Sequence, residues 1–214
     1  MNGMAEIKHY SPLEEKINII SHAIGFILSI VALVLLVAHA ILDGDVWHIV
    51  SFSIFGSSLI VLYAASTLYH RAKKPELRNR LNILDHASIY VLIAGTYTPF
   101  TLVTLKGPIG WVIFGTSWGL ALTGIILKLF FTGKYDLIST IMYVCMGWII
   151  VFAIKPLTHN LPLEGLLWLV AGGISYTIGA ILYSIEGIKF NHAIFHMLVL
   201  TGSFCHFMSV FFYV

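Results

Sequence analysis

The sequence predicts an all-α integral membrane protein: a seven-transmembrane helix bundle with its N-terminus in the cytoplasm and its C-terminus outside. Of the 214 residues, 58% are hydrophobic and only 10% are charged, and the mean hydropathy is +0.91. This composition leaves too few polar residues to cover the surface of a soluble domain. Seven apolar stretches fill almost the whole chain, and each is close to the roughly 20 residues that cross a bilayer as a helix.

The apolar stretches define the expected helices and the domain organisation. We expect helices near residues 17–42, 46–69, 81–105, 109–131, 137–154, 163–185 and 193–214. Residues that break helices mark the joints, as at Asp43-Gly44-Asp45, Lys106-Gly107-Pro108, Thr132-Gly133-Lys134 and Leu161-Pro162. No linker is long enough to separate two domains. Residues 1–16 are therefore predicted to form a cytoplasmic N-terminal segment, and residues 17–214 a single membrane domain.

The basic residues predict the orientation, because cytoplasmic loops of membrane proteins carry an excess of Lys and Arg. With the N-terminus placed inside, all of the 12 basic residues except Lys106 and Lys155 fall on the inner side. The chain then ends outside at Val214, and we expect a multi-pass protein of the inner (plasma) membrane of the cell. Basic loops beside a membrane are explained by anionic lipid headgroups, so they give no reason to expect nucleic-acid binding.

Polar side chains from three separate spans are expected to meet near the inner edge of the membrane. They are Ser66 and His70 at the end of the second span, Asp85 in the third, and His192 and His196 at the start of the last. His192 and His196 are four residues apart, so they share one helix face and differ in height by about 6 Å. Ionisable side chains at such positions in a bundle are candidates for a functional site.

The residue types indicate a zinc site. Three neutral imidazoles with an open fourth position hold catalytic Zn²⁺, which lowers the pKa of its bound water to about 7. We therefore predict His70, His192 and His196 as ligands of Zn²⁺. Asp85 is expected to hydrogen-bond the water, to accept its proton as general base and to return it to a leaving group. Ser66 is expected to steady a ligand or to donate a hydrogen bond to a carbonyl oxygen that gains negative charge.

Single histidines in a membrane bundle commonly do no more than hydrogen-bond neighbouring helices, so it is the convergence of several that favours a metal. We interpret His22 as a packing residue. His206 follows His196 by roughly 15 Å along the last helix, too far to bind the same ion, and is expected to be a hydrogen-bonded interior histidine. His86 is turned by about 100° from Asp85 around the helix and is left out of the metal site.

Other patterns concern packing. Gly115-x₃-Gly119 offers a small-residue surface on which two helices can approach closely. Pro99 is expected to kink the third span and to widen a cavity beside it. Cys145 and Cys205 lie in apolar segments and are expected to be buried free thiols, not a secreted disulfide framework.

Taken together, the motifs resemble the hemolysin III family, the bacterial branch of the progestin and adipoQ receptor family, over essentially the full length. They are Glu15-x₂-Asn18-x₂-Ser21-His22, Ser66-x₃-His70 with Asp85, Gly95-Thr96-Tyr97-Thr98-Pro99-Phe100, and His192-x₃-His196. The resemblance implies zinc bound by His70, His192 and His196, with Asp85 contacting the water of the metal. Ser66 matches a serine of the wider group, which includes alkaline ceramidases.

Three functions remain open at this point. The ceramidase likeness implies a resident zinc hydrolase whose substrate is the acyl amide or ester of a membrane lipid. The family name implies a pore-forming cytolysin, but a secreted pore former must stay soluble before insertion, and this chain carries a strong orientation signal instead. A receptor-like protein could use the same ligands to hold zinc structurally. Nothing in the sequence identifies the substrate or a protein partner.

Overall fold

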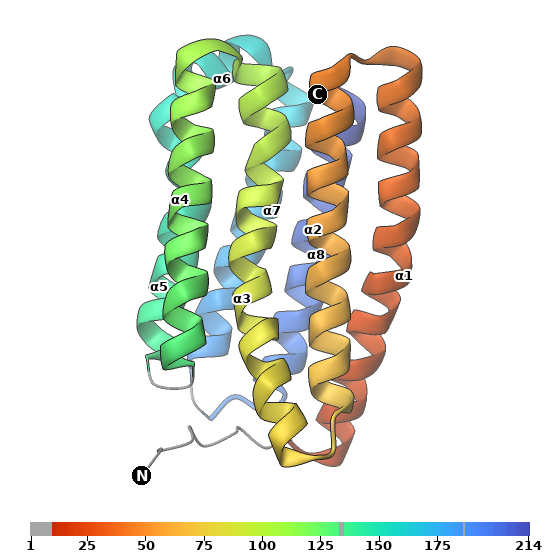
Figure 1. Ribbon diagram of the computed structural model, residues 1–214, viewed down its shortest axis with the longest axis vertical. Helices are drawn as coiled ribbons and strands as arrows, with labels where there is room; N and C mark the ends of the chain where they lie inside the picture. The colour runs from red at the N-terminus through yellow and green to blue at the C-terminus, as the bar shows by residue number, and fades with distance from the viewer. Residues whose placement is uncertain (1–9, 133–134, 186) are drawn as a thin grey trace.

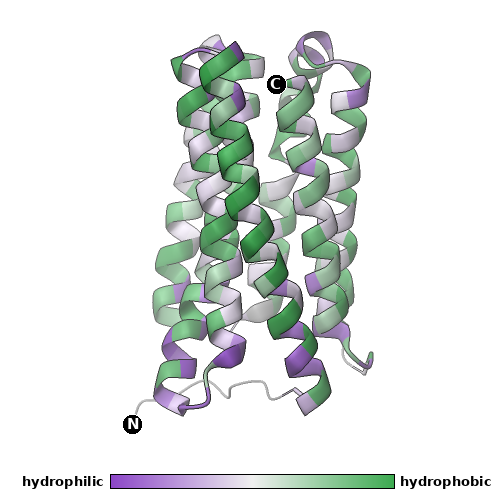
Figure 2. Ribbon diagram, turned by 90° about the vertical axis from the view of Figure 1, so that its right-hand side faces the viewer, coloured by the Kyte–Doolittle hydropathy of each residue, from purple (hydrophilic) through white to green (hydrophobic). Residues whose placement is uncertain are grey.

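The computed structural model describes residues 10–132, 135–185 and 187–214, which form one bundle of long helices lying side by side (Figure 1). Within the described chain, seven helical segments are long and apolar enough to cross a membrane. Figure 2 shows hydrophobic residues along the middle of the bundle and hydrophilic residues gathered at its ends. The chain is therefore a multi-pass membrane protein. Lys8 and Lys134, two of the basic residues used to predict its orientation, lie outside the described residues.

The first helix, α1, spans Pro12–Asp43 and so begins before the predicted start at residue 17. The reason is a strong start signal, because the Ser11 hydroxyl accepts a hydrogen bond from the backbone N–H of Glu14 at 3.3 Å. Pro12 follows in the first turn, where a missing N–H is harmless. The acidic residues Glu14 and Glu15 consequently belong to the helix and not to the segment before it.

The second and third helices, α2 and α3, span Val46–Arg71 and Pro75–Pro99. A π-helical turn, Phe100–Leu105, continues the third span. Pro99 has no backbone N–H to donate to the preceding turn, so the predicted distortion takes the form of this wider turn. The third span is the central one, since 78% of its most apolar window is buried inside the bundle.

The remaining spans follow the predicted order, but the fifth is longer and is interrupted. α4 spans Gly107–Phe131, α5 Asp136–Gly147, α6 Ile154–Asn160, α7 Leu163–Ser184 and α8 Asn191–Tyr213, with a 3₁₀ stretch at Ile149–Ala153 between α5 and α6. Tyr97 of α3 satisfies the backbone at this break. Its hydroxyl donates to the carbonyl of Gly147 at 2.8 Å and accepts from the N–H of Ile150 at 3.1 Å.

Two packing predictions are wrong. A side chain added at Gly115 or Gly119 would meet nothing within 4 Å, so this small-residue surface faces outward from the bundle. Cys145 is exposed on α5, whereas Cys205 is buried as predicted, and both are free thiols. Small or apolar residues on a membrane helix do not by themselves tell whether a face contacts lipid or protein, because both surroundings are apolar.

The bundle closes through its first and last helices. α1 packs against α2 and also against α8, while α7 packs along α8. Residues close to the two ends of the sequence therefore lie side by side. This closure brings the start of α8 next to the end of α2 and the start of α1, where the predicted site lies.

Candidate metal centre

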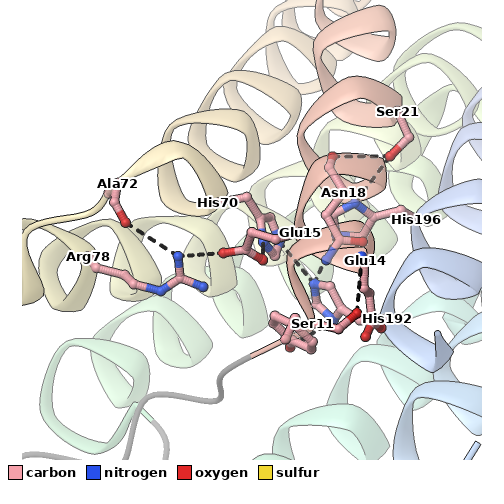
Figure 3. Close-up of polar contacts among 11 residues, drawn as sticks. Ser11, Glu14, Glu15, Asn18, Ser21, His70, Ala72, Arg78, His192 and His196 are labelled. Carbon is pink, nitrogen blue, oxygen red and sulfur yellow. Dashed lines mark hydrogen bonds and ion pairs between the residues drawn. The ribbon is translucent and has the colours of Figure 1, made fainter. Parts of the chain in front are cut away.

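Three buried histidines meet at the end of the bundle where α1 begins (Figure 3). His70 comes from the last turn of α2, whereas His192 and His196 occupy the first turns of α8. The Nε2 atom of His192 lies 3.0 Å from Nε2 of His70 and 3.0 Å from Nε2 of His196. All three rings offer a nitrogen within 4.8 Å of the others, so the cluster could hold a metal ion.

The other ring nitrogen of each histidine, Nδ1, lies at a side chain from α1 or from the residue just before its cap. The pairs are His70 with Glu15 at 2.9 Å, His192 with Tyr10 at 3.1 Å, and His196 with Ser21 at 3.5 Å. Burial raises the pKa of the Tyr10 phenol well above its usual range, so this hydroxyl stays neutral. One short stretch of chain thus contacts the outward edges of all three rings.

These partners determine which nitrogens carry hydrogen. A carboxylate only accepts, so the N–H of His70 lies on Nδ1 and points at Glu15. The Ser21 hydroxyl donates to the carbonyl of Asn18 at 3.1 Å, which leaves its oxygen to accept from Nδ1 of His196. Nε2 of both rings then presents a lone pair toward Nε2 of His192, and each lone pair can accept a hydrogen bond from His192 or bind a cation. Nitrogens bound tetrahedrally to zinc at about 2.0–2.1 Å lie roughly 3.3 Å apart, which the cluster approaches.

Glu15 is itself held in place by a second contact. Its Oε1 atom lies 2.5 Å from Nη1 of Arg78, which belongs to the first turns of α3. The same Nη1 donates to the carbonyl of Ala72 at 3.4 Å (Figure 3). The guanidinium also lies over the Tyr69 ring, 4.7 Å from its centroid. The orientation of the His70 ring therefore depends on α1, α2 and α3 together.

Asp85 and Ser66 lie in the wall of a cavity that His192 and His196 also line. Asp85 is buried, and its carboxyl group interacts electrostatically with the His70 ring and the Ser66 hydroxyl. The Ser66 hydroxyl has no hydrogen-bond partner of good geometry among the described residues. Asp85 is not among the residues whose ligand atoms converge in the cluster.

The cavity continues from the histidines far along the bundle. Its wall includes Thr96 and Phe100 of the third span, and it reaches Leu157 of α6 and Leu166 of α7 near the opposite end. Most of the lining side chains are apolar. The wall also contains polar side chains, among them Ser66, Asp85, Thr96 and His206.

The remaining histidines divide into neighbours of the site and unrelated residues. His22 stacks on the ring of His196 with centroids 3.5 Å apart, in keeping with the packing role predicted for it. His86 donates from Nδ1 to the carbonyl of Asn82 at 2.9 Å and is not part of the cluster. His206 is buried, but its Nδ1 has no partner within the described part of the chain, so the predicted hydrogen bond is absent.

The sequence alone does not reveal the residues that hold the three histidines in place. Glu15 was noticed only as part of a motif, and its signal is an acidic residue in the first turn of a membrane helix, which rarely occurs without a partner. Arg78 was counted as an orientation signal, although the structure buries it against Glu15. No pattern points to Tyr10, because its contact with His192 joins residues 182 positions apart.

The chain is similar in sequence to several known proteins over most of its length. Hemolysin-3 of Bacillus cereus is 49% identical over 201 residues, which cover 94% of this chain and 92% of that protein. A Hemolysin-3 homolog of Bacillus subtilis is 48% identical over 200 residues, covering 94% of each chain. The human monocyte to macrophage differentiation factor is 29% identical over 203 residues, covering 92% of this chain and 83% of its own.

No solved structure matches the chain significantly. A family model described as Haemolysin-III related matches residues 10–207, nearly the whole of the described chain and all of the histidine cluster. The chain belongs to the haemolysin-III related family.

Proposed function

We propose that this protein is a resident membrane hydrolase that binds Zn²⁺ through His70, His192 and His196 and cleaves the acyl amide or ester of a membrane lipid. The observation that carries the proposal is the convergence of three Nε2 atoms, 3.0 Å apart in two pairs, at one end of an apolar cavity. Zinc is the metal of choice because imidazole nitrogens suit it and it needs no redox partner.

The chain's own residues supply the remaining chemistry. A bound metal ion provides positive charge that polarises a carbonyl and makes water acidic. Asp85 accepts a proton from that water and passes it to the leaving nitrogen or oxygen. The Ser66 hydroxyl, which lacks a partner of good geometry in the described chain, donates to the carbonyl oxygen as it gains negative charge. The apolar cavity holds the acyl chain and excludes water from it.

We place this site at the cytoplasmic face of the plasma membrane. Basic residues gather beside the histidine cluster, at the end of α2 (Arg71), in the connection that follows it (Lys73 and Lys74) and in the first turns of α3 (Arg78 and Arg80). Such density of positive charge favours the cytoplasmic side. The lipid then enters from the membrane, and its polar part reaches the metal near the aqueous interface.

A cytolytic role is the second candidate, and the printed name of the Bacillus cereus relative favours it. It predicts that purified protein added from outside releases dye from liposomes, whether or not Asp85 is intact. The seven apolar spans count against it, because an exported pore former needs a soluble form before it inserts.

The test compares metal content and turnover in detergent-purified full-length variants. We expect stoichiometric zinc in the wild type, loss of zinc in His192→Ala, and retained zinc with a loss of about 10²–10⁴-fold in turnover in Asp85→Asn, because only the proton transfer is removed. Zinc is measured by elemental analysis, and turnover by fatty-acid release from a panel of lipid amides and esters. His159→Ala, which removes an exposed histidine at the other end of the bundle, is the control. Zinc without any turnover in the wild type would contradict hydrolysis and favour a structural metal.

A further inference from the structure

Tyr10, just before α1, and Glu15 and Ser21 of α1 contact the outward-facing ring nitrogens of the histidine cluster. We propose that Glu15, held by Arg78, is the principal positioning residue of the metal centre, and that Tyr10 and Ser21 complete its action by directing Nε2 of all three histidines inward. The inference rests on the proposed metal centre but not on the proposed hydrolysis.

Both carboxylate oxygens of Glu15 have partners. Oε2 accepts from Nδ1 of His70 at 2.9 Å, while Oε1 lies 2.5 Å from Arg78. Metal-binding histidines usually donate their second ring N–H to a carboxylate or a carbonyl, which fixes the tautomer and makes the ligating nitrogen more basic. Glu15 provides that contact from a helix that contributes no ligand of its own.

Arg78 holds the Glu15 carboxylate in place. Its guanidinium contacts Glu15 of α1, the carbonyl of Ala72 just after α2, and the face of Tyr69 within α2. A planar guanidinium with several fixed donors can hold such an arrangement, whereas the ammonium of a lysine offers a point charge on a flexible stem. Arg78 therefore acts through Glu15 and not on the histidines directly.

Tyr10 and Ser21 do for the α8 histidines what Glu15 does for His70, but more weakly. Tyr10 combines its 3.1 Å contact at Nδ1 of His192 with stacking of the two rings, whose centroids lie 4.5 Å apart. The Ser21 hydroxyl lies 3.5 Å from Nδ1 of His196, at the limit of a hydrogen bond. Charge-assisted hydrogen bonds are about twice as strong as neutral ones, so Glu15 dominates.

The experiment titrates Co²⁺, a coloured stand-in for zinc, into detergent-purified full-length protein stripped of metal. Loss of a partner behind a metal-binding histidine typically weakens binding by about 10–100-fold. We expect Glu15→Gln, whose amide oxygen still accepts from His70, to weaken binding by about 10-fold and to keep the tetrahedral Co²⁺ spectrum. Glu15→Ala is expected to weaken it by about 100-fold and to change the spectrum, since the ring is no longer oriented. Glu76→Gln, which removes an exposed acid in the first turn of α3, is the matched control.

The variant Arg78→Lys distinguishes an effect on the position of the Glu15 carboxylate from an effect on folding. It should weaken Co²⁺ binding by itself, yet add nothing to the loss in Glu15→Gln, because it acts through the same carboxylate. Wild-type affinity and spectrum in Glu15→Ala would overturn the inference, as would additive losses in the double variant. If Glu15→Ala does not fold, as judged by circular dichroism, the Gln and Lys variants decide alone. A wild type that takes up no Co²⁺ would refute the metal centre itself, whereas normal uptake without lipid turnover would refute only the hydrolase.

Discussion

His206 lies in α8, and its Nδ1 atom is buried without a hydrogen-bond partner among the described residues. An unpaired buried polar atom destabilises a fold, and its replacement by an apolar group of similar size is neutral or stabilising. His206 also packs so closely on Gly172 that an added side chain there would come within 2.7 Å of its Nε2. The residue is therefore held in place by packing and not by polar contacts.

We predict that His206→Leu leaves the free energy of unfolding unchanged or raises it by about 1 kcal/mol. Ser209→Ala, one turn further along α8, is expected to lower it by about 0.6 kcal/mol, because Ser209 donates to the carbonyl of Gly165 at 2.8 Å. Thermal melting of both variants in one detergent tests the pair. A clear loss of stability in His206→Leu would contradict the prediction.

At the scale of elements, the break in the fifth span is the feature with the clearest physical cause. Two backbone groups at the break are satisfied by the hydroxyl of Tyr97 on α3. We predict that Tyr97→Phe lowers the free energy of unfolding by about 1–3 kcal/mol for each group left unpaired away from water. Tyr213→Phe removes a hydroxyl that makes no hydrogen bond in the described part of the chain and should melt like the wild type. Equal melting temperatures for the two variants would mean that another group satisfies the break.

For the whole molecule, the predicted orientation is open to a direct test. A single cysteine placed at Lys73, between α2 and α3, should react with a membrane-impermeant thiol reagent only from the cytoplasmic side. A cysteine at Lys106, between the third span and α4, should react only from outside. The two native cysteines are replaced first, since Cys145 is exposed on the bundle. Labelling of both positions from the same side would disprove the seven-span arrangement. Labelling of each position from the side opposite to the expected one would show that the orientation is the reverse of the predicted one.

The sequence was sufficient for the number and order of the spans, because length and hydropathy alone define a membrane helix. It was also sufficient to bring His70, His192 and His196 together, since loop charge and helix rise give each residue a depth in the membrane. Depth does not determine rotation about the helix axis. That is why Gly115 and Gly119 were placed at a helix contact although they face outward.

The residues that hold the three histidines in place could not be predicted from the sequence, for a different reason. Glu15 and Arg78 are 63 positions apart, and their pairing follows from how α1 and α3 both pack on α2. The interrupted fifth span was missed because Tyr97, which satisfies its freed backbone, comes from another helix. Local sequence patterns do not reveal contacts between residues that are far apart in the chain.

The contact between α1 and α8 has a consequence for how the protein is made. Glu15 and Ser21 lie in α1 and are synthesised before His192 and His196, which lie in α8. The ring nitrogens of α8 meet their partners only when the final span has inserted and docked beside the first. Metal uptake by this cluster would therefore require α8 to be docked beside α1, and a product truncated before α8 would remain without it.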